Sequence, residues 1–151
     1  MDEAGVITAI TGMFAGVETV TAAGSTFFFT GSDHMFPFAT LVTTDEYETV
    51  SDLGRPGIFR LNIGVGKETF RALFGTDVPL PDPQTGAGSD RDFAALDQLL
   101  PHPVYGRQFW LCILNPSTAT FDGQLRPFLV EAHALLAARD AKRATRQGDT
   151  A

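Results

Sequence analysis

Residues 57–65, GIFRLNIGV, change polarity at every second position. Arg60 and Asn62 fall on one side of this segment, and Leu61 and Ile63 fall on the other. Because successive side chains of a β-strand point to opposite faces, the alternation predicts a strand with one face in a core and one polar face. The chain is therefore expected to fold around a sheet.

The remaining patterns predict four more strands and four helices. Apolar spacing after the capping residue Asp2 predicts a first helix that stops at Gly16, and two β-prone segments around the turn 22–25 predict a hairpin. The five predicted strands are 17–24, 26–31, 38–45, 57–65 and 107–116, and the later helices are 66–75, 89–100 and 124–143. We expect an α+β fold with an antiparallel sheet of about five strands packed against N-terminal, central and C-terminal helices.

The chain length of 151 residues fits one core. We assign residues 1–143 to a single α+β domain and 144–151 to a polar C-terminal tail. No apolar run approaches the ~20 residues that span a bilayer, and the N-terminus is acidic, so no membrane contact and a cytoplasmic location are expected. The single cysteine, Cys112, cannot form an internal disulfide and is predicted to be an inert core thiol.

The charge distribution argues against nucleic-acid binding. The net charge is −7, and residues 1–54 carry eight acidic side chains and no lysine or arginine. Nucleic-acid binders normally present a basic surface that neutralises phosphates. Possible partners are therefore a small anionic molecule or a protein, and an exposed edge strand or the C-terminal helix could build a homodimer.

One group of side chains could line a ligand-binding cleft at the polar face of the predicted sheet. It combines an imidazole, a guanidinium that suits a carboxylate or phosphate, amide groups and an aromatic wall. The candidate ligand-binding residues are Arg60, Asn62, His102, Tyr105, Trp110 and Asn115. Three of them also have a structural interpretation: His102 could bond a backbone carbonyl, Arg60 could pair with an acid from residues 45–52, and Trp110 could fill the core beneath the C-terminal helix with its indole N–H bonded nearby.

Motifs for catalysis, metal and cofactor binding are missing from the sequence. No H-x-x-x-H or C-x-x-C spacing occurs, so neither a metal nor a cofactor is expected. The acidic residues 45–48, DEYE, are interpreted as solvated loop charges. Residues 64–67, GVGK, precede a predicted helix, where backbone N–H groups beside Lys67 could hold a small anion or simply form a tight turn.

Several long blocks of the chain resemble a bacterial family of domains of unknown function, DUF family 6194. The blocks are TFFF, FPFATLVTTDEY, RPGIFRLNIGVGKETFRALFG, DFAALDQLLPHPVYGRQFWLCILNPS and LRPFLVEAHALLAAR. A fainter pattern, FWLCIL leading to LRPFLVEAHALL, is similar to MmcQ/YjbR-like domains. That similarity implies a compact α+β fold with an antiparallel sheet and terminal helices, and a DNA contact that the acidic balance of this chain opposes.

Two classes of function follow from these observations. The first is a non-enzymatic module that binds a small ligand or a protein, supported by the possible cleft and the missing catalytic motifs. The second is a small-molecule enzyme in which His102 acts as general acid or base and Arg60 holds an anionic substrate. The first predicts a pocket without a paired acid and base, and the second predicts His102 within hydrogen-bond reach of a carboxylate or Tyr105 inside a concave pocket.

Overall fold

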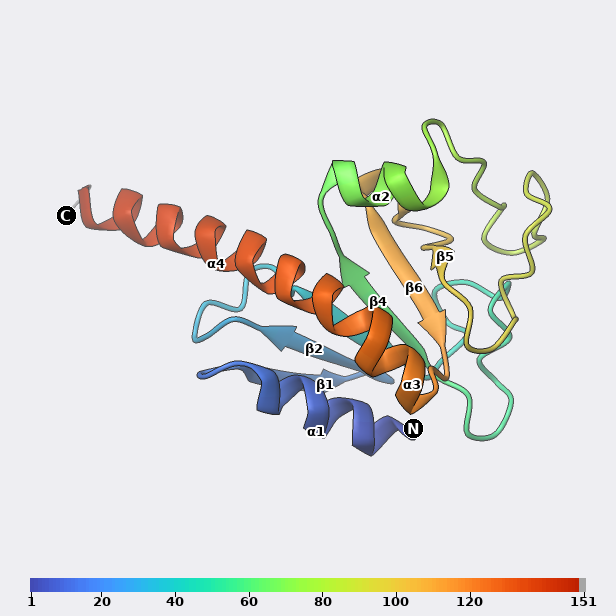
Figure 1. The fold of residues 1–151 in the computed structure, drawn as a ribbon, viewed down its shortest axis with the longest axis horizontal. Coiled ribbons are helices and arrows are strands. Elements are labelled where there is room, and N and C mark those ends of the chain that lie inside the picture. The colour runs from blue at the N-terminus through green and yellow to red at the C-terminus, as the bar shows by residue number, and fades with distance from the viewer. Residues whose placement is uncertain (150–151) are drawn as a thin grey trace.

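The structure, a computed structural model, describes residues 1–149, which form one domain around a six-stranded antiparallel sheet (Figure 1). The strands are β1 (Glu18–Ala22), β2 (Ser25–Phe29), β3 (Ala39–Val42), β4 (Arg60–Gly64), β5 (Leu100–Pro101) and β6 (Trp110–Leu114), in the spatial order β1-β2-β3-β4-β6-β5. The helices are α1 (Glu3–Met13), α2 (Lys67–Phe74), α3 (Thr118–Thr120) and α4 (Arg126–Asp149), with a 3-10 turn η1 (Gly106–Gln108) and a π turn η2 (Phe121–Leu125). The predicted α+β class is confirmed, and β5 is the strand that the sequence did not indicate.

Local sequence signals account for the N-terminal elements. The Asp2 side chain accepts a hydrogen bond from the Gly5 N–H (2.8 Å) and caps α1, as predicted. Ala23 and Gly24 form the turn between β1 and β2 with positive φ angles of 51° and 76°. Two positive φ angles in a two-residue turn match the twist of the flanking strands, which explains why this hairpin forms where the sequence predicted it.

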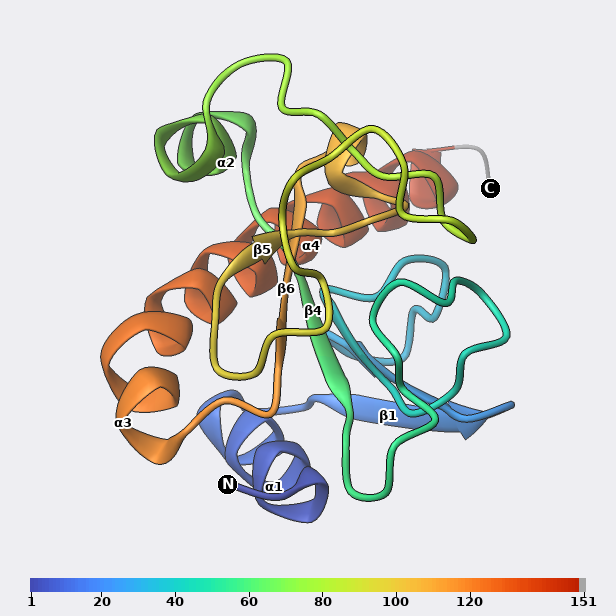
Figure 2. The same cartoon turned by 90° about the vertical axis from the view of Figure 1, so that its right-hand side faces the viewer.

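The two faces of the sheet are covered by different material (Figure 2). Helices α1 and α4 cover one face, and their apolar side chains pack on alternate residues of the strands, among them Leu41, Leu61 and Ile113. The opposite face carries Arg60 and Asn62, and the long loops 43–59 and 75–99 lie over it. The alternation in β4 thus separates a helix-covered core from a polar layer beneath loops.

The helix predicted for residues 89–100 is wrong. This segment consists of turns that end in β5, where Leu100 pairs with Cys112. The Asp97 N–H donates to the Leu114 carbonyl (2.7 Å), so the chain bonds to the edge of β6 instead of closing helical hydrogen bonds. Phe93 and Leu100 are buried, but Leu96 is 47% exposed, so the apolar residues supply separate contacts rather than one helical stripe.

The C-terminal helix is longer than predicted at both ends. Helical structure begins at Thr118, where the Ser117 Oγ accepts from the Thr120 N–H (3.1 Å). The π turn η2 precedes Pro127, and there the Arg126 N–H donates to the Phe121 carbonyl. Residues 144–149 of the predicted tail continue α4, and 150–151 lie outside the described residues. No helix within residues 1–149 combines the length and apolarity needed to cross a bilayer.

Candidate functional site

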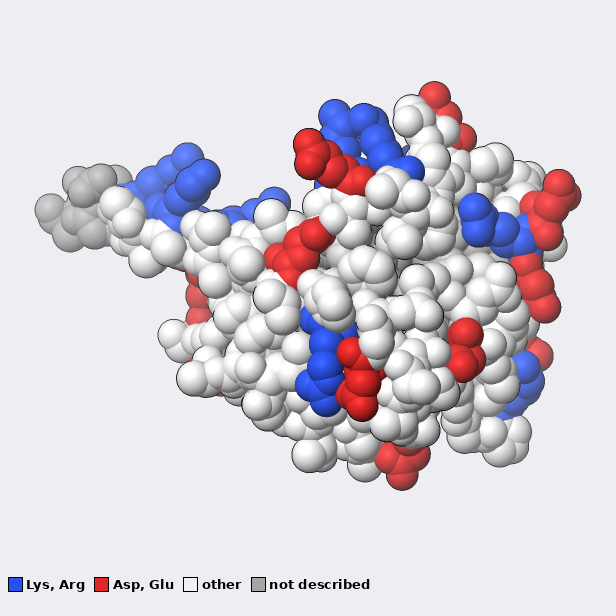
Figure 3. Space-filling model, in the orientation of Figure 1, with Lys and Arg blue, Asp and Glu red and all other residues white. Residues whose placement is uncertain are grey.

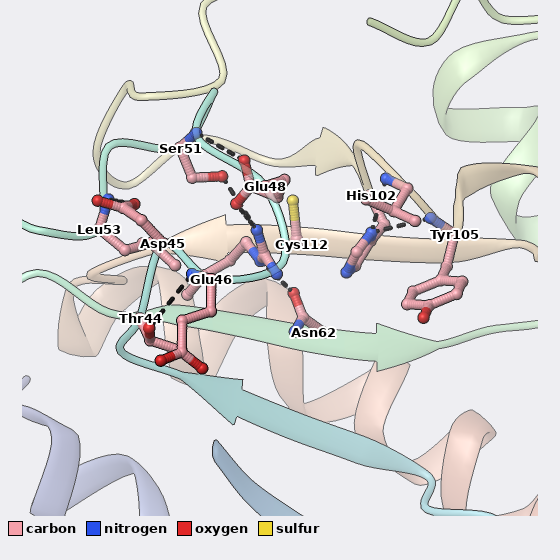
Figure 4. Close-up of polar contacts among 12 residues, drawn as sticks. Thr44, Asp45, Glu46, Glu48, Ser51, Leu53, Asn62, His102, Tyr105 and Cys112 are labelled. Carbon is pink, nitrogen blue, oxygen red and sulfur yellow. Dashed lines mark hydrogen bonds and ion pairs between the residues drawn. The ribbon is translucent and has the colours of Figure 1, made fainter. Parts of the chain in front are cut away.

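A buried polar cluster lies on the loop-covered face of the sheet (Figure 4). Arg60 forms an ion pair with Glu48, and its Nη1 also donates to the Ser51 Oγ (3.1 Å). Its Nε donates to the Asn62 Oδ1 (2.8 Å), and the Asn62 Nδ2 donates to the Thr40 Oγ1 (2.9 Å). Arg60, Asn62, Ser51 and Glu48 are all at most 2% exposed.

This cluster anchors the loop 43–59 to the sheet. Burial of an ion pair is tolerated only when both groups are paired and hydrogen-bonded, and these contacts supply that pairing. The structural interpretation of Arg60, a pair with an acid from residues 45–52, is therefore confirmed. The interpretation of residues 45–48 as solvated charges is wrong for Glu48, which is 1% exposed, and the Asp45 carboxylate accepts the N–H of Leu53 (2.7 Å).

His102 folds the chain that follows it. Its Nδ1 accepts the backbone N–H groups of Val104 (3.0 Å) and Tyr105 (2.9 Å), so the ring proton must sit on Nε2 and the imidazole is neutral. Burial, with a smaller contribution from the charge of Arg60, holds the pKa of His102 well below its ordinary value of 6.5. No Asp or Glu in residues 1–146 pairs with this ring, and Tyr105 is 54% exposed.

The neutral His102 makes folding stability depend on pH. Below pH 6.5 the unfolded chain binds a proton at this site while the folded chain does not. The contribution of His102 to the free energy of unfolding should therefore fall by up to about 1.4 kcal/mol for each unit by which the pH is lowered. Urea titrations between pH 7.5 and 5 measure this slope. His102→Asn is the matched control, because its Oδ1 can accept the same two N–H groups without titrating. An identical slope in both proteins would contradict the prediction.

Trp110 and Asn115 occupy opposite ends of β6. The Trp110 indole lies over Gly64, where an added Cβ would come within 2.9 Å of the ring, so only glycine fits beneath it. Asn115 has a φ of 41°; its Oδ1 accepts from the Phe59 N–H (2.9 Å) and its Nδ2 donates to the Gly57 carbonyl (2.8 Å). Asn115 therefore fastens the turn before β4.

The structure thus divides the six candidate residues among four places. Arg60 and Asn62 share the buried cluster, His102 and Tyr105 lie together at the turn after β5 with ring centroids 5.0 Å apart, and Asn115 lies at the far end of β6. Trp110 pairs across the backbone with His102, whose N–H donates to its carbonyl (2.9 Å), but its side chain faces a cavity of its own.

That cavity, the Trp110 cavity, lies between α4 and the adjoining ends of β4 and β6. It has a volume of about 270 Å³ and is lined by Phe36, Pro37, Gly64, Val65, Trp110, Leu135, Leu136 and Arg139. Its lining is mostly apolar, and Arg139 supplies the one charged group, with its guanidinium over the Phe36 ring at 4.9 Å. Sequence reasoning missed Phe36, Leu135 and Arg139; the spacing of Leu135 and Arg139 by one helical turn was the available signal.

The helix start that could have held a small anion is filled by the protein itself. The Glu131 carboxylate on α4 accepts the Gly66 N–H (2.6 Å) and the Thr69 hydroxyl (2.6 Å) at the first turn of α2. A carboxylate is favoured there by the unpaired N–H groups and the helix dipole. Glu131 thus takes the position of the anion that the sequence suggested.

Neither a reactive thiol nor a metal site has support in the described residues. Cys112 is buried, and burial raises the pKa of its thiol to about 12. In the part of the chain that the structure describes, no three His, Cys, Asp or Glu side chains converge as metal ligands.

Comparisons with known proteins identify a family but no relative of known activity. No curated protein and no solved structure matches the chain. None of the comparisons supports the resemblance to MmcQ/YjbR-like domains. Residues 1–145 match the model of a family of unknown function, DUF6194, and the chain belongs to that family.

Proposed function

We propose that this protein is a non-enzymatic module that binds a small molecule with an apolar body and an anionic group in the Trp110 cavity. The observation that carries the proposal is the lining of that cavity: an indole, a phenyl ring and two leucines beside one guanidinium. Ligand sites are typically apolar concavities with a few placed polar groups. The cavity volume of about 270 Å³ favours a small ligand.

Arg139 supplies the selectivity for an anion. No carboxylate within residues 1–146 forms an ion pair with Arg139, and the Arg139 guanidinium lies over the Phe36 ring instead. Its N–H groups are therefore available for a ligand carboxylate. Figure 3 also shows Lys and Arg side chains on the projecting part of α4, and side chains of both signs on the body.

The catalytic alternative has less support than binding. Both Arg60 and the Nδ1 of His102 are engaged by the protein's own groups, so neither is placed to hold a substrate or to take its proton. A binding module needs only the cavity and the charge beside it. We expect such a module to act in the cytoplasm, on the basis of the sequence alone.

Octanoate and 1-octanol form a matched pair of ligands for the test. Octanoate is expected to shift the emission of Trp110, the only tryptophan, with saturable binding, and 1-octanol is expected to bind roughly tenfold more weakly because it cannot pair with Arg139. Fluorescence titration measures both affinities.

Substitutions of two arginines on α4 test whether octanoate binds in the Trp110 cavity. Arg139→Gln should weaken octanoate binding by about tenfold, Arg139→Lys should restore most of it, and Arg146→Gln on the same helix should leave it unchanged. Equal binding of octanoate and 1-octanol would remove the anionic group from the proposal. No saturable binding of either ligand would overturn the proposed function.

A further inference from the structure

The loop between β2 and β3 forms one wall of the Trp110 cavity. Residues 30–37, here named the strap, run against α4 in Figure 1 and contribute Phe36 and Pro37 to the cavity lining. The opposite wall comes from α4 itself. Any movement of the strap away from α4 would therefore open the cavity along one side.

Side chains rather than backbone hold the strap to α4. The Thr30 Oγ1 donates to the Asp140 Oδ2 (2.5 Å), and Asp33 forms an ion pair with Arg143. Arg143 also lies over the Phe36 ring, at 5.6 Å from its centroid. Within the described chain, residues 31–37 make no backbone–backbone hydrogen bond to any other segment. Contacts of this kind break without disturbing the sheet.

The closed strap leaves two polar atoms without partners. Asp140 Oδ1 and Arg143 Nη1 are buried and lack a hydrogen bond. An unsatisfied buried polar atom destabilises the arrangement that buries it, because its bond to water has been lost. Opening of the strap would return both atoms to water, so part of the cost of breaking the contacts with α4 is offset.

The neighbourhood of the strap allows this movement. A second cavity of about 690 Å³ lies between the strap and α4, lined in part by Thr30, Asp33 and Arg143. On the other side, His34 stacks on Phe29 with centroids 4.4 Å apart and bonds Glu18. These contacts attach the strap to β1 and β2, so it can pivot on the sheet while it separates from α4.

We propose that the strap is a lid that controls entry to the Trp110 cavity, with the Asp33–Arg143 ion pair as its latch. This inference rests on the proposed function, because the lid acts on that ligand site. The closed lid keeps Phe36 and Pro37 in the cavity wall, and the open lid admits the ligand. Screening or removal of the latch raises the open population and speeds association more than it changes equilibrium affinity.

The test compares Asp33→Asn with Asp122→Asn. The second variant breaks the exposed ion pair between Asp122 in η2 and Arg126 at the start of α4. Acrylamide quenching of Trp110 fluorescence in the ligand-free protein reports opening, and stopped-flow fluorescence reports the association rate of octanoate. Asp33→Asn should increase quenching and raise the association rate by roughly three- to tenfold, whereas Asp122→Asn should change neither. In 1 M NaCl the quenching of the ligand-free wild-type protein should approach that of Asp33→Asn.

Failure of the lid and failure of the ligand site are separable. If octanoate binds, if quenching and association rate are the same in wild type and Asp33→Asn, and if 1 M NaCl leaves quenching unchanged, the lid is overturned and the ligand site stands. If octanoate does not bind, the proposed function fails, and quenching alone decides whether the strap opens. Increased quenching in both Asp33→Asn and Asp122→Asn would also overturn the latch, because the effect would not be specific to it.

Discussion

Glu48→Ala is expected to lower the free energy of unfolding by about 3–5 kcal/mol. The substitution leaves the Arg60 guanidinium, which is buried with 2% exposure, without its carboxylate partner. The Ser51 N–H, which donates to the Glu48 Oε2 (2.9 Å), loses its acceptor as well. Urea unfolding followed by circular dichroism measures the loss. Asp52→Asn, which removes the exposed ion pair with Arg55 and tolerates the positive φ of 51° at this position, is the control with less than about 1 kcal/mol.

A double variant separates two contributions to the free energy of unfolding: the penalty for a buried charge without a partner, and the net stabilisation by the ion pair itself. Glu48→Leu combined with Arg60→Met replaces both charges by apolar groups of similar length. It should recover part of the stability lost in Glu48→Ala, because the Ser51 N–H and the Asn62 Oδ1 still lack their partners. Recovery would mean that the pair is required only because each partner is buried. A loss below 1 kcal/mol in Glu48→Ala would contradict the role of the cluster as the anchor of loop 43–59.

Phe38→Ala and Phe36→Ala are expected to separate stability from binding. Phe38 is fully buried and contacts the rings of Phe14, Phe28 and His133, so its truncation should cost about 3–5 kcal/mol. Phe36, two residues earlier, is 43% exposed and lines the Trp110 cavity. Its truncation should cost less than about 1 kcal/mol of stability and weaken octanoate binding severalfold.

Thermal unfolding and fluorescence titration of both variants measure the two effects. The ligand affinity of Phe38→Ala is to be measured well below its lowered unfolding temperature, so that only folded protein is titrated. If Phe36→Ala loses as much stability as Phe38→Ala, Phe36 belongs to the core and not to a ligand site. If it binds octanoate as the wild type does, the strap makes no contact with the ligand.

Local signals predicted those elements that a cap, a turn or an alternation of polarity marks within a few residues. The cap at Asp2, the turn at Ala23 and Gly24, and the alternation around Arg60 each specify their own structure. Residues 89–100 failed because their apolar spacing matched a helix while the decisive bond, from Asp97 to Leu114, joins a distant strand edge. Tertiary pairing outweighed the local pattern there.

The candidate site was harder to predict because its parts come from distant segments. The Trp110 cavity joins Phe36 from the strap, Gly64 from β4 and Arg139 from α4, and no spacing in the sequence marks them as neighbours. The chemical type of a polar side chain was a poor guide to the candidate site for the same reason. Arg60 and His102 are the residues that suggest chemistry, yet Arg60 pairs with Glu48, as its structural interpretation expected, and His102 accepts backbone N–H groups instead of bonding a carbonyl.

The bonds of Glu131 make the two long walls of the Trp110 cavity mechanically unequal. They fasten α4 to the start of α2, and Leu135, one helical turn further, lies against Gly66 and in the cavity lining. The helical wall is thus held in register with the sheet, whereas the strap is attached by side chains alone. A bound ligand would accordingly contact a rigid wall at α4 and a movable wall at the strap. Differences in ligand width should therefore be tolerated better at Phe36 than at Leu135.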